Sequence, residues 1–172
     1  HDGPISIPED FTVQGHLSIE RCSGPIRFSA KMRVEHIIRV YQCASFDGFT
    51  RDIACSKLLI SECPNFKYLP TFDKTASYDI DINDCRGLTQ IIDPIMTGGD
   101  VYILRCDNLA SLPNNSSMRS LNLNDCAALS SLPANMFTRS LYITGCRNLI
   151  GKNSEDWCRI YSAKHTNEVA IL

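Results

Sequence analysis

The sequence predicts an α/β solenoid with a curved parallel β-sheet of about seven short strands, an extended or 3₁₀ convex side and a C-terminal helical cap. Three observations predict it. Cysteines recur at a nearly constant spacing, two alternating aliphatic residues precede each of them, and further apolar residues follow each at fixed distances. A period of about 20 residues is typical of arrays in which each repeat buries its apolar face against its neighbours.

Seven of the nine cysteines keep this period, with separations of 21, 20, 22, 21, 20 and 20 residues: Cys22, Cys43, Cys63, Cys85, Cys106, Cys126 and Cys146. We expect a structural ladder of buried free thiols, because a thiol is small and apolar and donates weakly to a turn carbonyl. Disulfides would leave one of the seven unpaired, and a zinc site needs closely spaced cysteine pairs, which this spacing lacks. Free thiols indicate a reducing compartment.

Aliphatic residues stand five and three positions before every ladder cysteine. They are Leu17, Ile38, Leu58, Ile80, Val101, Leu121 and Leu141, then Ile19, Val40, Ile60, Ile82, Ile103, Leu123 and Ile143. Apolar side chains two residues apart predict a strand with those side chains inward. The expected strands cover residues 16–20, 37–41, 57–61, 79–83, 100–104, 120–124 and 140–144, stacked about 4.8 Å apart.

The segment after each cysteine also carries apolar residues, three and six positions on. The first set is Phe46, Phe66, Leu88, Leu109, Leu129 and Leu149, with Pro25 departing; the second is Phe28, Phe49, Leu69, Ile91, Leu112 and Leu132. Proline follows the second set at Pro70, Pro113 and Pro133. So short a period leaves little room for a helix, and proline favours extended backbone, so we expect an extended return segment.

The frame L-x-L-x-x-C-x-x-L-x-x-L-P resembles the leucine-rich repeat, with cysteine where asparagine is common. The stretches "LASLPNNSSMRSLNLNDC" and "LSSLPANMFTRSLYITGC" resemble repeats of secreted bacterial (type III-like) effectors of the E3 ligase family. The repeats of plant immune receptors are the second resemblance. In the effector family this domain recognises host proteins, and the resemblance implies the same here, with any E3 ubiquitin ligase domain lying outside this chain.

Three parts of the chain are expected. Residues 1–16 match the second half of a repeat and form a truncated N-terminal repeat or cap, and residues 17–150 hold seven repeats. Residues 151–172 form a C-terminal cap with a helix over 154–164, since Asn153 or Ser154 can serve as its N-cap.

Composition excludes several classes of partner. The 172 residues are 44% hydrophobic and 21% charged, with a formal net charge of −2. A slightly acidic chain lacks the basic footprint of nucleic-acid or membrane-surface binding. No apolar stretch approaches the ~18 residues of a spanning helix. We expect a monomer without cofactors.

Side chains six, four and two positions before each ladder cysteine should point to the concave face of the sheet. Aromatic and leucine side chains there suit a protein partner, and an acidic centre suits a partner with a basic patch. The candidate partner-binding residues are Arg39, Tyr41, Leu59, Asp79, Asp81, Asp100, Tyr102, Leu104, Asn122 and Tyr142.

Catalysis finds little support in the sequence. Cys158 and His165, with Asp156 nearby, could form a thiol nucleophile and its base, but seven residues on a helix place them two turns apart. No metal site is expected.

The expected function is therefore non-catalytic protein recognition on the concave face, as the host-target or substrate-recognition part of a larger bacterial effector. Such a chain would be secreted into host cytosol, or otherwise be cytoplasmic. The alternatives are a ligand-sensing or regulatory leucine-rich-repeat domain of an intracellular receptor or scaffold, and a cysteine-dependent enzyme using Cys158.

Overall fold

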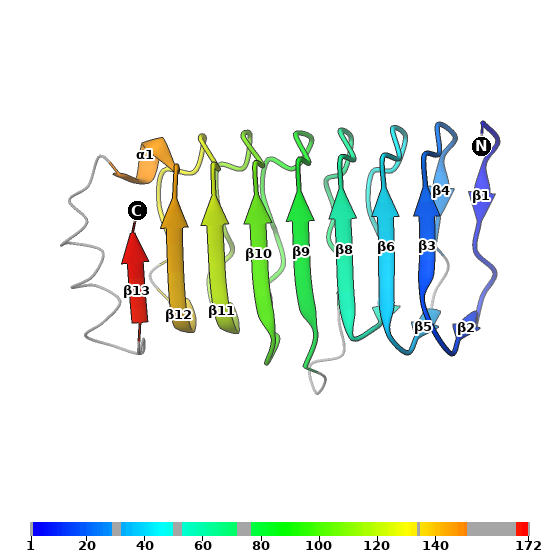
Figure 1. Ribbon diagram of the computed structural model, residues 1–172, viewed down its shortest axis with the longest axis horizontal. Coiled ribbons are helices and arrows are strands. Elements are labelled where there is room, and N and C mark those ends of the chain that lie inside the picture. Colours follow the sequence, from blue (N-terminus) through cyan, green and yellow to red (C-terminus); the bar gives the residue numbers. More distant parts are fainter. Residues whose placement is uncertain are drawn as a thin grey trace.

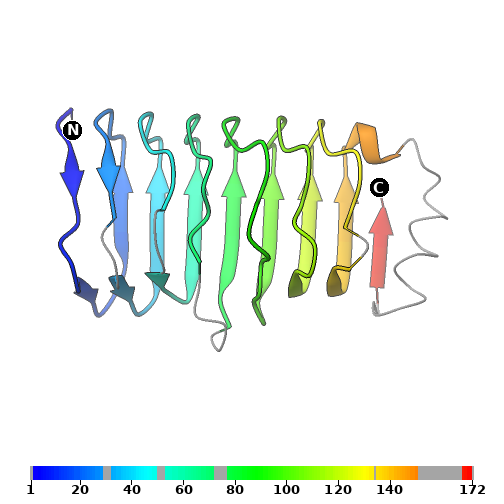
Figure 2. The same cartoon turned by 180° about the vertical axis from the view of Figure 1, so that it is seen from behind.

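The computed structural model describes residues 2–28, 32–49, 53–71, 77–133, 135–150 and 168–171. The chain winds as a solenoid of mostly parallel β-structure, with almost no helix in the described residues (Figure 1). Each turn contributes one strand to a main sheet, then bends and returns along the opposite side (Figure 2). The predicted repeat architecture is therefore confirmed at the level of a parallel β-solenoid.

The main sheet holds eight parallel strands in the order β13-β12-β11-β10-β9-β8-β6-β3. Their bounds are β3 Leu17–Glu20, β6 Ile37–Tyr41, β8 Lys57–Ser61, β9 Asp79–Asn83, β10 Asp100–Leu104, β11 Ser117–Asn124, β12 Phe137–Thr144 and β13 Glu168–Ile171. The first seven are the strands that the aliphatic pairs predict. Equivalent repeat positions pair across the sheet, as Ile60 does with Ile82 and Ile82 with Ile103. A fixed register follows, since slipping by one residue would expose every inward side chain.

A left-handed backbone residue ends each predicted strand, immediately before the ladder cysteine. These residues have φ between 49° and 67°: Arg21, Gln42, Glu62, Asp84, Arg105, Asp125 and Gly145. A positive φ bends the chain sharply, at a cost for any residue other than glycine. The bend turns the next residue, the cysteine, into the core.

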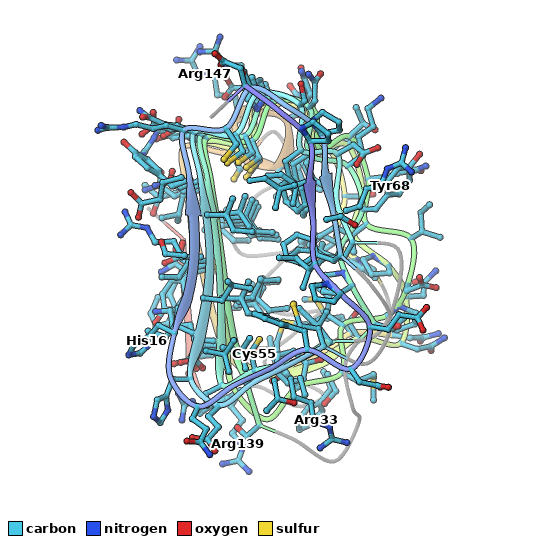
Figure 3. The ribbon with its side chains drawn as sticks, turned by 90° about the vertical axis from the view of Figure 1, so that its right-hand side faces the viewer. His16, Arg33, Cys55, Tyr68, Arg139 and Arg147 are labelled. Carbon is cyan, nitrogen blue, oxygen red and sulfur yellow. The ribbon has the colours of Figure 1, made fainter. Side chains whose placement is uncertain are left out.

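The ladder cysteines are all buried, with exposures of 0–4%. Six of these thiols, from Cys22 to Cys126, donate to the carbonyl at the end of the same strand, and four of the six also donate to a carbonyl of the preceding turn. Cys43 Sγ, for example, lies 3.3 Å from the Tyr41 oxygen and 3.5 Å from the Ile19 oxygen. The eight described cysteines have free thiols. In the end-on view of Figure 3 the yellow sulfur atoms gather at the top of the picture, beside the bend that ends each strand of the main sheet, called here the upper bend. Cys55 lies near the other end of the core, toward the lower bend that leads into the next strand.

The return side and the lower bend are extended, and neighbouring turns pair there only briefly. β1 (Ile5–Ser6) pairs with β4 (Ile26–Arg27), and β2 (Thr12–Val13), β5 (Met32–Val34) and β7 (Ile53–Ala54) form a three-stranded sheet at the lower bend. Residues 5–13 thus follow the return half of a turn and stack on the turn after it.

The core is one continuous apolar cluster between the sheet and the return side. Phenylalanines fill its N-terminal half, where the rings of Phe46 and Phe66 stack with centroids 5.6 Å apart. Leucines take the same repeat position from Leu88 onward. In the first turn Pro25 is exposed and Ile26 is buried in its stead.

The C-terminal end differs in part from the expectation. A four-residue helix, α1 (Arg147–Ile150), follows the last ladder cysteine, and β13 adds a strand that the sequence pattern does not predict. The helix expected over 154–164, with Cys158 and His165, lies outside the described residues. Successive turns superpose closely in Figure 3, so the curvature of the sheet from turn to turn is small.

Candidate functional site

The exposed face of the main sheet, called here the sheet face, carries the side chains six, four and two positions before each ladder cysteine. Strand pairing aligns them in three columns that run across the strands. The middle column reads Ser18, Arg39, Leu59, Asp81, Tyr102, Asn122 and Tyr142. From β8 to β12 these side chains are half-buried, because each packs between neighbours about 4.8 Å away on either side.

In the N-terminal part of the sheet face, charged and aromatic side chains of this chain contact one another. Arg39 lies 3.6 Å from the Glu20 carboxylate and its guanidinium sits 5.1 Å from the centre of the Tyr41 ring. Burial raises the pKa of Tyr41, and a hydrogen bond with Glu62 adds to that effect. Of the candidate residues, Arg39 and Tyr41 therefore already have partners within the chain.

The centre of the sheet face is acidic, as the sequence predicts. Arg119 donates two hydrogen bonds to Asp100, at 2.7 and 2.6 Å, and these hold the pKa of that carboxyl below its usual value. Asp79 accepts the backbone N–H of Asp100 at 2.8 Å. Burial raises the pKa of Asp81, opposed by the positive charge of Lys57. Three carboxyl groups thus stand in three different environments.

Leucine and tyrosine side chains alternate with polar ones along the middle column. Leu59 and Tyr102 flank Asp81 on the adjacent strands, and Tyr142 follows beyond Asn122. Leu104 lies next to this group in the third column. Burial raises the pKa of Tyr102, and the neighbouring carboxylates of Asp100, Asp79 and Asp81 add to the shift.

The structure brings together most, but not all, of the candidate residues. Leu59, Asp79, Asp81, Asp100, Tyr102 and Leu104 lie on the three consecutive strands β8–β10. Tyr41 and Tyr142 stand on β6 and β12, five strand spacings apart or about 24 Å. A single partner side chain cannot contact both.

A cavity on the return side is a feature that the sequence pattern does not predict. It has a volume of about 420 Å³ and reaches from the surface to Ile80 of β9. Tyr68, Ile92 and Met96 line it and are 52%, 65% and 37% exposed, which is unusual for such side chains. The sequence gives one signal for it, at the position seven residues after the ladder cysteine. Three repeats have proline there, at Pro70, Pro113 and Pro133, whereas the repeat of Cys85 has Ile92.

The left-handed residues form a second row, along the upper bend. Gln42 accepts from Arg21 at 3.3 Å and donates to Glu62 at 2.7 Å, while Arg105 holds both oxygens of Asp84 at 2.9–3.0 Å. These bonds link successive turns at residues with positive φ. Side-chain links of this kind offset part of the cost of positive φ.

The described residues offer few groups for covalent or metal chemistry. Burial raises the pKa of Cys63 and Cys106 to about 11 and of Cys55 to about 12, so these thiols stay protonated at neutral pH. Within the described ranges no three His, Cys, Asp or Glu side chains are grouped to hold a metal ion. Cys158 lies outside those ranges.

In the part of the chain that the structure describes, no helix is both long and apolar enough to cross a membrane. No family model matches the sequence, and neither a curated protein nor a solved structure gives a match. The repeat pattern and the geometry of the sheet face therefore carry the functional argument.

Proposed function

We propose that this chain is a non-catalytic protein-recognition module of the leucine-rich-repeat type that binds a partner protein through strands β8–β10 of its sheet face. The observation that carries the proposal is the grouping of Leu59, Tyr102 and Leu104 around half-buried carboxylates on a rigid sheet. Tyrosine and leucine anchors with nearby charge are typical of interfaces between proteins. A sheet surface serving only solubility would carry serine, threonine and lysine there.

The resemblance to bacterial effector repeats extends this proposal. The module would be the target-recognition part of a larger protein delivered into host cytosol, with residues 151–172 as its C-terminal cap. A reducing cytosol suits the ladder, because its cysteines are buried free thiols and the fold contains no disulfide among the described cysteines that an oxidant would have to form.

A second candidate function is favoured by the return-side cavity. Its volume is within the range of small-molecule sites, and apolar side chains dominate its lining, with Lys67 and Asp93 among the lining residues. A ligand-sensing domain would use such a site. The sheet face is preferred as the main site because it combines apolar anchors with aligned charge.

Affinity capture from eukaryotic cytosolic lysate tests the two candidates against each other. One bait is the unchanged chain, the second carries Leu59→Glu, Tyr102→Glu and Leu104→Glu, and a matched control carries Tyr68→Glu, Ile92→Glu and Met96→Glu. Both variants gain three negative charges and lose three large apolar side chains, from opposite sides of the solenoid. Circular dichroism checks that each bait is folded.

The proposal expects a partner retained by the unchanged chain and by the return-side variant but lost by the sheet-face variant. A partner retained by the sheet-face variant and lost by the return-side variant would refute it and favour the cavity. Equal capture by all three baits would place recognition on neither surface.

A further inference from the structure

Asp81 occupies the middle of the sheet face, at the centre of β9. Strand pairing places Leu59 beside it on β8 and Tyr102 beside it on β10. The carboxylate therefore stands between an aliphatic and an aromatic side chain on the two neighbouring strands, each strand about 4.8 Å away across the sheet.

The charges of the sheet face leave this carboxylate without an ion pair. Among the described residues, Glu20 pairs with Arg39 and Asp100 with Arg119, and Asp79 accepts a backbone N–H. No cationic nitrogen of a described residue lies within 4.0 Å of Asp81, although Lys57 on β8 acts on it electrostatically. A half-buried anion loses hydration, and the more distant charge of Lys57 offsets only part of that cost, since burial still raises the pKa of Asp81.

We propose that Leu59, Asp81 and Tyr102 form a socket for a lysine or arginine side chain of the partner protein, an inference that rests on the proposed function of the sheet face. The methylene stem of the incoming side chain packs on Leu59, its cation lies against the Tyr102 ring, and its charge pairs with Asp81. Each of these three contacts is favourable for a long cationic side chain.

The chain already holds one example of this arrangement. Arg39 lies 5.1 Å from the centre of the Tyr41 ring and 3.6 Å from the Glu20 carboxylate on the neighbouring strand. A cation, a tyrosine ring and a carboxylate thus meet on the same sheet face, three strands from Tyr102. The proposed socket has the Tyr102 ring and the Asp81 carboxylate, and the partner protein would supply the cation.

The test uses capped amino acids as probes and nuclear magnetic resonance of the full chain. N-acetylarginine amide and N-acetyllysine amide present the cation, and N-acetylcitrulline amide is the neutral control of nearly the same shape as arginine. The proteins are the unchanged chain, Asp81→Asn, and Asp107→Asn, which makes the same charge change at an exposed position outside both the sheet face and the cavity lining.

We expect saturable shifts of the Leu59, Asp81 and Tyr102 signals with one or both cationic probes, with citrulline giving none. Asp81→Asn should weaken binding about two- to fivefold, the effect of losing one partly exposed ion pair, and Asp107→Asn should leave it unchanged. Equal binding of citrulline, or unchanged binding by Asp81→Asn, would overturn the proposal.

The captured partner separates this inference from the proposed function. If the partner binds the sheet face with the same affinity in Asp81→Asn, the socket is wrong and the proposed function stands. If the cationic probes bind as expected but the captured partner is retained by the sheet-face variant, cation binding beside Asp81 stands and the proposed function is wrong.

Discussion

Replacing Cys85 by alanine measures what one rung of the cysteine ladder contributes. Its side chain is fully buried, and its Sγ lies 3.4 Å from the Asn83 oxygen and 3.9 Å from the Ile60 oxygen. The Asn83 oxygen also accepts the Glu62 N–H at 2.9 Å, so it keeps a partner when the thiol is removed. The cost should therefore come from packing, with little from hydrogen bonding.

The magnitude of this cost follows from the size of the sulfur atom. Removing one buried group of about methylene size costs about 0.8 kcal/mol of transfer free energy. A cavity of roughly 20 Å³ adds about 0.5 kcal/mol at about 24 cal/mol per Å³. We expect Cys85→Ala to lower the free energy of unfolding by about 1–1.5 kcal/mol.

Urea unfolding followed by circular dichroism measures this change, with the unchanged chain beside it under the same reducing conditions. A loss below about 0.3 kcal/mol would contradict the buried position of the sulfur atom. A loss above about 4 kcal/mol would contradict the free thiol, because losses of that size are typical of removing a disulfide or a metal ligand.

Three further predictions concern the thiols and the charges, and one the backbone. Iodoacetamide at neutral pH should label none of the eight described cysteines in the folded chain, as peptide mass mapping would show; rapid labelling of one would contradict their burial. Asp100→Asn should cost about 0.5–1 kcal/mol of stability at pH 7 and little at pH 2, because the pKa of Asp100 is lowered by Arg119 and its contribution disappears as the folded-state carboxyl is protonated. Asp81→Asn should instead raise the free energy of unfolding by a few tenths of a kcal/mol at pH 7, because burial disfavours the charged carboxylate and raises the pKa of Asp81. This gain should disappear at low pH, where the carboxyl is protonated, and urea midpoints at pH 7 and pH 2 check the sign of both changes. Gly145→Ala should lower the melting temperature, since φ is +67° there and the added Cβ would lie 1.9 Å from Asp125 Oδ1, and an unchanged melting temperature would contradict this geometry.

Much of the fold could be predicted because its signals repeat along the chain. The pairs exemplified by Leu58 and Ile60 define each strand and its inward face, and all seven such strands are present. The left-handed position before each cysteine could not be predicted, because residues as different as Arg21, Glu62 and Asp84 occupy it. Its conformation is imposed by the stacked turns on either side, and local preference does not reveal it.

The sequence predicts which side chains lie on the sheet face, but it does not predict how far apart they are. Alternation along each strand places Tyr41 and Tyr102 on the same face, but the distance between them depends on the order of strands in the sheet. The cavity beside Tyr68 could not be predicted, because its lining residues come from several turns and no single repeat position marks them all in the sequence. The degree of curvature could not be predicted either, since the angle between successive turns depends on packing on both sides of the core.

Radical footprinting of the complex with the captured partner tests recognition by the sheet face most directly. The oxidation rates of Tyr102 and Leu104 on the sheet face are compared with those of Tyr68 and Met96 on the return side, with and without the partner. Recognition by the sheet face predicts slower oxidation of Tyr102 and Leu104 in the complex and unchanged rates at Tyr68 and Met96. Protection of the return-side pair, with Tyr102 and Leu104 unaffected, would contradict it.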